Sequence, residues 1–218
     1  MGENAESLSL ADRLAKHIRE LLISGELSPG QHLSETAFSE RFEVSRNSLR
    51  ETFRLLTKDG LLKHETNRGV TVAVPTIASI IDIYRVRRLV ECGALRQAWH
   101  QHQSIKKMRE AVEIAQAHRA DEDWLKVGSA NMQFHSAVVD LADSRRVSEF
   151  YERVSAELRL GFGLLENRAQ LHAPFVDMNY SILLLSEGGK AKEAADEMDH
   201  YLNLSERTVL KALERVTD

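Results

Sequence analysis

Hydrophobic residues follow the spacing of amphipathic helices along most of this 218-residue chain. In residues 9–25 they recur every three or four positions, which predicts a helix with one apolar face. Its stripe consists of Leu10, Leu14, Ile18, Leu21 and Leu22. Two shorter helices are predicted over residues 34–42 and 45–59, because each begins with a serine that can cap a helix N-terminus.

Residues 61–74 have a different pattern. Val70, Val72 and Val74 alternate with other residues after Asn67-Arg68-Gly69, and this pattern predicts a small β-hairpin with a tight turn. Three short helices followed by a hairpin is the order of a winged helix-turn-helix. We therefore expect residues 1–75 to form a winged helix-turn-helix DNA-binding domain.

Long amphipathic patterns return after Pro75 and predict a second, all-helical domain over residues 76–218. The expected helices are 77–101, 105–119, 121–142, 145–166, 173–187 and 190–216. Their starts are assigned from Ser104, Asp121, Ser144 and Pro174. The fold class is thus mainly α: the winged domain followed by an antiparallel bundle of about six helices.

The charge of the chain changes this picture only when it is counted locally. A formal net charge of −4 argues against a strongly basic nucleic-acid binder. Residues 41–70, however, carry seven basic and four acidic side chains, a net of +3, and this range includes the third helix and most of the hairpin.

Composition constrains the class of protein further. A single cysteine, Cys92, excludes an internal disulfide and a cysteine-based zinc site. No apolar run approaches the length of a membrane span, and the polar N-terminus does not resemble a signal peptide, so we expect a cytoplasmic protein.

The first turn of the third helix carries the side chains expected of a recognition helix. Arginine can bind guanine through two hydrogen bonds and asparagine can bind adenine in the same way, while serine hydroxyls suit phosphates. The candidate DNA-binding residues are Ser45, Arg46, Asn47, Ser48 and Arg50. The alternative is that these positions form only the solvated face of an amphipathic helix; the hairpin and the short preceding turn favour DNA binding.

These residues carry a resemblance to the GntR family of bacterial transcription regulators. It rests on Pro29-Gly30, Leu33, Val44-Ser45-Arg46, Leu49-Arg50-Glu51, Leu55, Gly60-Leu61 and Arg68-Gly69. The resemblance implies that Ser45 to Ser48, Arg50 and the wing residues Asn67, Arg68 and Gly69 contact DNA. The chain departs from the family at Thr36, where relatives often have an arginine, so we expect a weaker phosphate contact there.

The second domain resembles the effector domain of the FadR-like subfamily, although more loosely. Arg87 and Glu91 match an R-x-x-x-E pattern, and Phe134-His135 matches a Phe-His pair. Ala194-Ala195 and Met198 match a pattern on the last helix. The resemblance implies that this domain binds a small-molecule effector.

Many members of the subfamily hold a divalent metal on one aspartate and three histidines. The equivalent positions here are Asn131, His135, Asn179 and Tyr201, and only His135 is a good ligand. We therefore expect no metal and no cofactor. Together with Arg87, these residues would form a pocket for an organic anion such as a carboxylate. The alternative for His135 is a buried histidine of the core.

The expected function is that of a ligand-responsive regulator, a repressor that binds a palindromic operator as a homodimer. Its partners would be double-stranded DNA and a small organic acid, with no membrane. The alternative is a metal-dependent sensor with a degenerate site around His135. We do not expect an enzyme, because no nucleophile–base motif, phosphate-binding glycine loop or paired-carboxylate motif is present.

Overall fold

The computed structural model describes residues 9–65, 69–165 and 168–217. The N-terminal part consists of α1 (Leu10–Ser24), β1 (His32–Leu33), α2 (Glu35–Arg41), α3 (Arg46–Lys58), β2 (Leu62–Glu65) and β3 (Gly69–Val72). The strands form an antiparallel sheet in the order β1-β3-β2. The predicted three helices and hairpin are confirmed, and β1 adds a third strand that the sequence pattern did not indicate.

Serine side chains cap all three helices of this part. Ser9, Ser34 and Ser45 each accept a hydrogen bond from the backbone N–H three residues later. These bonds satisfy N–H groups that have no partner within the helix, which explains where the helices begin. At the other end of α1, Gly25 has a φ of 81°, a left-handed conformation that glycine adopts without strain.

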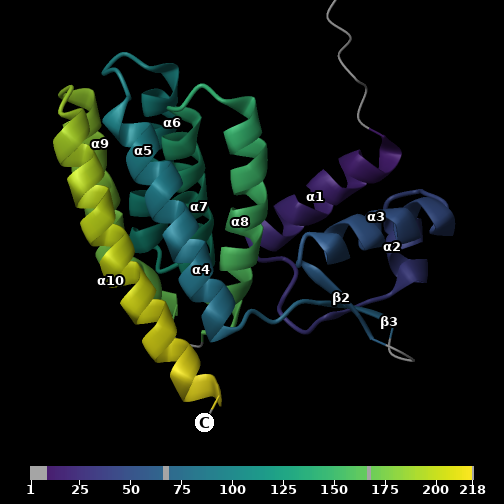
Figure 1. Ribbon diagram of the computed structural model, residues 1–218. Helices are drawn as coiled ribbons and strands as arrows, with labels where there is room; N and C mark the ends of the chain where they lie inside the picture. Colours follow the sequence, from purple (N-terminus) through teal and green to yellow (C-terminus); the bar gives the residue numbers. More distant parts are fainter. Residues whose placement is uncertain (1–8, 66–68, 166–167, 218) are drawn as a thin grey trace, which may run out of the picture.

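The C-terminal part is a bundle of helices (Figure 1). It is built from α4 (Ile77–Arg87), the π-helical turn η1 (Arg88–Cys92), α5 (Gly93–Arg96), α6 (Gln103–Ala120), α7 (Trp124–Asp140), α8 (Arg145–Gly163), α9 (Arg168–Glu187) and α10 (Ala191–Thr217). The elements α4, η1 and α5 follow one another without a break. The predicted fold class, a winged helix-turn-helix followed by a helical bundle, is confirmed.

Several predicted helix ends are wrong. The first bundle helix ends at Arg96 rather than at residue 101. His102, not Ser104, caps α6: its Nδ1 accepts a hydrogen bond from the backbone N–H of Ser104. Pro174 lies inside α9 instead of opening it, on the exposed side of the helix. Buried neighbours hold the helix together around that proline, since Leu171 and Phe175 are both packed in the core.

The helix α8 belongs to two hydrophobic cores. Leu158 and Phe162 pack in the bundle, which has the larger core. Ala156 and Leu160, on the opposite side of α8, pack in the core of the winged part together with residues of α1 and α3. Figure 1 shows α8 at the edge of the bundle, next to α1.

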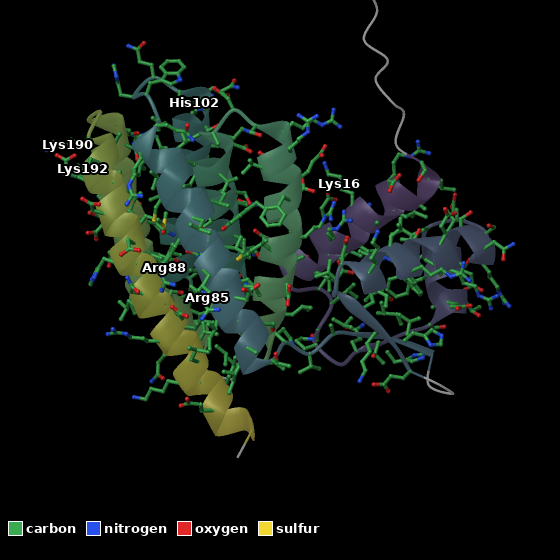
Figure 2. All side chains as sticks on the ribbon, in the orientation of Figure 1. Lys16, Arg85, Arg88, His102, Lys190 and Lys192 are labelled. Carbon is green, nitrogen blue, oxygen red and sulfur yellow. The ribbon has the colours of Figure 1, made fainter. Side chains whose placement is uncertain are left out.

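Close contacts support this junction. Arg159 on α8 donates hydrogen bonds through Nη2 to the carbonyl oxygens of Ser24, at the end of α1, and Leu125, in α7. Gly163 leaves room for the ring of Pro29, because a Cβ at position 163 would lie 2.8 Å from Pro29 Cδ. Lys16 projects from α1 near α8 (Figure 2), with its Nζ 4.0 Å from Glu152 Oε1.

Candidate nucleic-acid interface and buried polar site

The predicted DNA-binding residues lie at the solvent-exposed beginning of α3. Ser45, Arg46, Asn47 and Arg50 are exposed, and Ser48 is half-buried. The Ser45 hydroxyl caps the helix by accepting from Ser48 N–H at 3.1 Å, and the two hydroxyl oxygens lie 2.9 Å apart. The cap therefore fixes both serines, while Arg46 and Asn47 project into solvent at the positive end of the helix dipole.

The two arginines of this surface are oriented by α2. Arg50 Nε donates to Glu35 Oε2 at 2.9 Å, and Arg46 Nη2 lies 3.5 Å from the hydroxyl of Thr36. Glu35 and Thr36 lie on α2, so each of these contacts joins the two helices of the helix-turn-helix. No sequence motif marks Glu35 as part of this surface, because its position opposite Arg50 depends on how the two helices cross.

The turn between α2 and α3 is compact. Glu43 has a φ of 53°, and the backbone N–H of Val44 donates to the carbonyl of Ser39. The Ser39 hydroxyl donates in return to the carbonyl of Val44 at 2.6 Å. Val44 packs against the core of the winged part, so the turn holds the angle between the two helices.

The predicted wing residues are only partly described. Gly69 begins β3 with a φ of 78° and is exposed; a Cβ there would lie 3.1 Å from His32 Nε2. Asn67 and Arg68 lie outside the described residues. The start of the wing is thus placed next to His32, which the sequence analysis did not single out.

The structure brings all five predicted effector-site residues into one buried cluster in the bundle. Arg87 comes from α4, Asn131 and His135 from α7, Asn179 from α9 and Tyr201 from α10. Each is at most 7% exposed. The rings of His135 and Tyr201 lie edge to face, with centroids 4.8 Å apart.

Glu91 connects one half of the cluster. Its Oε1 accepts from Arg87 Nε at 2.7 Å and from the hydroxyl of Tyr151 at 2.6 Å, and its Oε2 lies 2.6 Å from His135 Nδ1. Glu91 lies within the π-helical turn, one i,i+4 step after Arg87. Turns of this kind are common at functional sites.

Asn131 connects the other half. Its Oδ1 accepts from Asn179 Nδ2 at 2.7 Å and from the Tyr201 hydroxyl at 3.0 Å. Phe175 closes this side, with its ring centroid 4.8 Å from that of Tyr201. The two halves meet where the His135 ring packs against Tyr201.

The protonation states of the cluster follow from its burial and charges. Burial alone would raise the pKa of Glu91, but the Arg87 guanidinium and the His135 ring outweigh it and lower the pKa to about 2. Burial lowers the pKa of His135, and the attraction of Glu91 opposes this only in part. At neutral pH the cluster therefore contains an ionised Arg87–Glu91 pair and a neutral imidazole.

Three polar atoms of the cluster are buried without a hydrogen-bond partner. They are Arg87 Nη2, His135 Nε2 and Asn179 Oδ1. Buried polar atoms without partners are rare, because each costs free energy comparable to a lost hydrogen bond. All three belong to the predicted effector-site residues.

Tyr151 is a member of the cluster that the sequence pattern did not predict. Tyr151 lies on α8, and its side chain also lines a surface cleft of about 240 Å³ between α1, α7 and α8, together with Ser136 and Val139. No local motif marks this tyrosine. Its hydroxyl reaches Glu91 because α8 packs against α7 and α4.

The donor set does not suit a divalent metal. At the positions where the subfamily places its ligands, Asn131 Oδ1 is already used by Asn179 and Tyr201, so only His135 offers a free imidazole nitrogen. Over residues 9–65, 69–165 and 168–217, no group of three or more His, Cys, Asp or Glu side chains is arranged to hold a metal ion.

Within the same described residues, no helix is long and apolar enough to cross a membrane.

Comparisons with known proteins agree with both parts of the fold. Residues 10–72 match the model of the bacterial regulatory proteins of the gntR family, and residues 82–204 match the FCD domain. A crystal structure of a protein assigned to the GntR regulators, from Rhodococcus sp. RHA1, superposes with a TM-score of 0.85 at 35% identity. That alignment covers 94% of this chain and 99% of the other.

Two curated bacterial regulators are also similar. The HTH-type regulator YdhC of Bacillus subtilis is 31% identical over 63% of each chain. The HTH-type transcriptional repressor RspR of Escherichia coli is 26% identical over 64% of this chain and 62% of its own length. The matched region thus spans slightly less than two thirds of these relatives.

All of these matches are transcription regulators rather than enzymes. Because the FCD model alone covers more than half of the chain, and the Rhodococcus structure aligns over nearly all of it, the family is established. The chain belongs to the GntR family of DNA-binding bacterial transcription regulators, in the group whose C-terminal part is an FCD domain.

Proposed function

We propose that this protein is a cytoplasmic repressor that binds a palindromic operator and responds to a small organic acid. Residues 1–75 would be the DNA-binding domain, and residues 76–218 the effector-binding and dimerisation domain. The observation that carries the DNA-binding half is the exposed first turn of α3, where Arg46, Asn47 and Arg50 project from a serine-capped helix start. Of the relatives, RspR is named a repressor.

The proposed DNA contacts involve the start of α3, Thr36 of α2 and the wing. Arg46 and Asn47 reach base edges in the major groove, while Ser45, Ser48 and Thr36 lie beside the backbone phosphates. Arg50 is held by Glu35 and exchanges that partner for DNA. The wing residues Asn67, Arg68 and Gly69 contact the neighbouring groove.

Each chain presents one recognition helix, so a palindromic operator requires two copies. We therefore propose a homodimer in which each winged part reads one half-site. The effector is proposed to bind at Arg87, Asn131, His135, Asn179 and Tyr201, because three of these side chains carry buried polar atoms without partners. It acts by binding the DNA-competent and DNA-incompetent states unequally.

The DNA-binding half is tested by selecting an operator from random double-stranded DNA and measuring gel shifts with the selected sequence. Arg46→Ala and Arg50→Ala are each expected to weaken specific binding by about tenfold to a hundredfold, since a bidentate base contact contributes about 1–3 kcal/mol. Arg145→Ala is the control, because Arg145 is also an exposed arginine but lies on α8, where it pairs with Glu149.

Unchanged binding in Arg46→Ala and Arg50→Ala would refute the assignment of α3 as the recognition helix. Equal losses in Arg145→Ala would show that only net charge matters. Sedimentation velocity of the wild-type protein, free and bound to the selected operator, tests the dimer: one chain per half-site is expected.

A further inference from the structure

The unpartnered atoms of the buried cluster define which hydrogen bonds a ligand must make. Arg87 Nη2 is a charged donor, because a guanidinium has only N–H groups and Nε is already bound to Glu91. The ligand must therefore place an acceptor there. A carboxylate oxygen is the acceptor that guanidinium groups bind most strongly.

The second unpartnered atom, His135 Nε2, is an acceptor. Glu91 is ionised and can only accept, so the proton of the short Nδ1–Oε2 contact belongs to His135 Nδ1. Burial keeps the imidazole neutral, and a neutral ring with its proton on Nδ1 has a lone pair on Nε2. The ligand must place a donor opposite this atom.

The third unpartnered atom, Asn179 Oδ1, is also an acceptor. The amide of Asn179 is oriented by its donation to Asn131 Oδ1, which leaves the carbonyl oxygen facing away from Asn131. The cluster thus offers one cationic donor and two neutral acceptors. A plain carboxylate, which can only accept, satisfies one of the three.

The net charge of the buried site limits which charges a ligand can carry. Arg87 and Glu91 already neutralise one another, and both are at most 1% exposed. A bound anion would leave a net negative charge in the bundle, and a bound cation a net positive one; either is costly in a buried site. A ligand that carries one charge of each sign leaves the site neutral.

Building on the proposed effector site, we propose that the effector is a zwitterion, a small molecule with an ammonium group next to a carboxylate, as in an α-amino acid. The carboxylate binds Arg87 Nη2, and the ammonium donates to His135 Nε2 and Asn179 Oδ1. Asn131 and Asn179 are neutral amides, so neither adds a charge to the site.

The test uses sets of acids that share a carbon skeleton and differ only at the α-carbon. Alanine, lactate, pyruvate and propionate form one set, and longer aliphatic, acidic and aromatic side chains form others. Thermal shift of the full-length protein identifies binders, and calorimetry measures Kd. In the set that binds, the amino acid is expected to bind about tenfold or more tightly than the hydroxy, oxo and unsubstituted acids, because charge-assisted hydrogen bonds are the strong ones.

The outcomes separate this proposal from the proposed function. A hydroxy, oxo or unsubstituted acid that binds as tightly as its amino counterpart overturns the zwitterion but leaves an organic-acid effector in place. The absence of any thermal shift overturns both the zwitterion and the effector site. DNA binding is measured separately by gel shift with the selected operator, and its result does not depend on whether an effector is found.

Two variants of Asn179 assign the binding to this cluster. Asn179→Leu removes the acceptor and is expected to weaken amino-acid binding by about tenfold, with little effect on the unsubstituted acid. Asn179→Gln keeps an uncharged amide with both a donor and an acceptor and is expected to retain the preference for the amino acid. Asn203→Leu, a change on the outer part of α10 where Asn203 accepts from Arg88, is the control and should leave both affinities unchanged. Equal affinities for all three variants would overturn the proposal.

Discussion

Glu91 determines the chemistry of the buried cluster at the scale of single residues. Its carboxylate accepts from Arg87, His135 and Tyr151, so every oxygen is satisfied without solvent. A buried carboxylate with this set of partners remains ionised far below neutral pH. The same pairing removes the net positive charge that Arg87 alone would give the site.

Stability should depend on pH through His135. The pKa of His135 is lowered from 6.5 in the folded state, so below this pH the unfolded chain binds a proton that the folded chain resists. The stabilising contribution is present above 6.5 and is lost as the pH falls. His135→Gln, which can still donate to Glu91, should therefore lose less unfolding free energy than wild type between about pH 7 and pH 5.

The measurement is urea unfolding at a series of pH values, with the free energy of each variant compared with that of wild type. The charged groups facing His135 are Glu91 and Arg87, and neither changes its charge in this range. His118→Gln, on α6, is the control for the loss of a histidine outside the cluster. Parallel curves for His135→Gln and wild type would show that the imidazole is not kept neutral by the fold.

Sequence alone identified five members of this cluster, because their positions match a family pattern along three helices and the first bundle helix. It identified neither the position of Tyr151 nor the orphaned atoms. Tyr151 carries no motif, and which atom of Arg87 or Asn179 lacks a partner depends on rotamers that only the packed helices determine. The residue types were predictable, and the hydrogen-bond pattern was not.

At the scale of elements, glycines set how closely the helices approach their neighbours. Gly163 ends α8 against the ring of Pro29, and a Cβ there would be 2.8 Å from Pro29 Cδ. Gly93, at the start of α5, has a helical conformation and no heavy atom within 4 Å of the position of a Cβ. The two glycines thus differ in surroundings although both are helical.

Alanine substitution should separate these two roles. Gly93→Ala is expected to raise the free energy of unfolding by about 0.5–1 kcal/mol, because alanine loses less conformational entropy in a helix. Gly163→Ala should not give this gain and should increase hydrogen exchange at the Pro29 loop, because the new methyl group displaces the ring. Denaturant unfolding and hydrogen exchange check both; equal stabilisation by the two substitutions would contradict the close packing at Gly163.

Helix existence was predictable from hydrophobic spacing, but several helix ends were not. Pro174 was expected to begin a helix, because proline lacks an N–H. In the fold its ring faces solvent while buried neighbours on both sides continue α9. His102 caps α6 because its other nitrogen is held by Asp143, a partner 41 residues away. Long-range packing overrides local preference in both cases.

At the scale of the whole molecule, α8 joins the winged part to the bundle. Leu158 and Leu160 lie on the same helix and are each 1% exposed, but Leu158 packs in the bundle core and Leu160 in the core of the winged part. Tyr151 of the same helix bonds to the buried cluster. One rigid helix therefore contacts the candidate effector site and supports the DNA-binding part.

Truncation of either leucine should lower the free energy of unfolding by a similar amount, but the two variants should loosen different parts of the molecule. Leu158→Ala and Leu160→Ala are each expected to lower the free energy of unfolding by about 2–5 kcal/mol. Hydrogen exchange resolved by residue should show faster exchange in α1 and α3 for Leu160→Ala, with weaker operator binding, and in the bundle for Leu158→Ala. The same exchange pattern in both variants would contradict the division of α8 between two cores.

The shared helix α8 also limits how this protein can be recombined. A chimaera that joins residues 1–75 to an unrelated sensor would separate the winged part from Ala156 and Leu160, two side chains of its own core. It would also lose the Arg159 bond to the end of α1. The structural unit that binds DNA is therefore larger than residues 1–75. A chimaera with a different sensor domain must keep the face of α8 that carries Ala156 and Leu160.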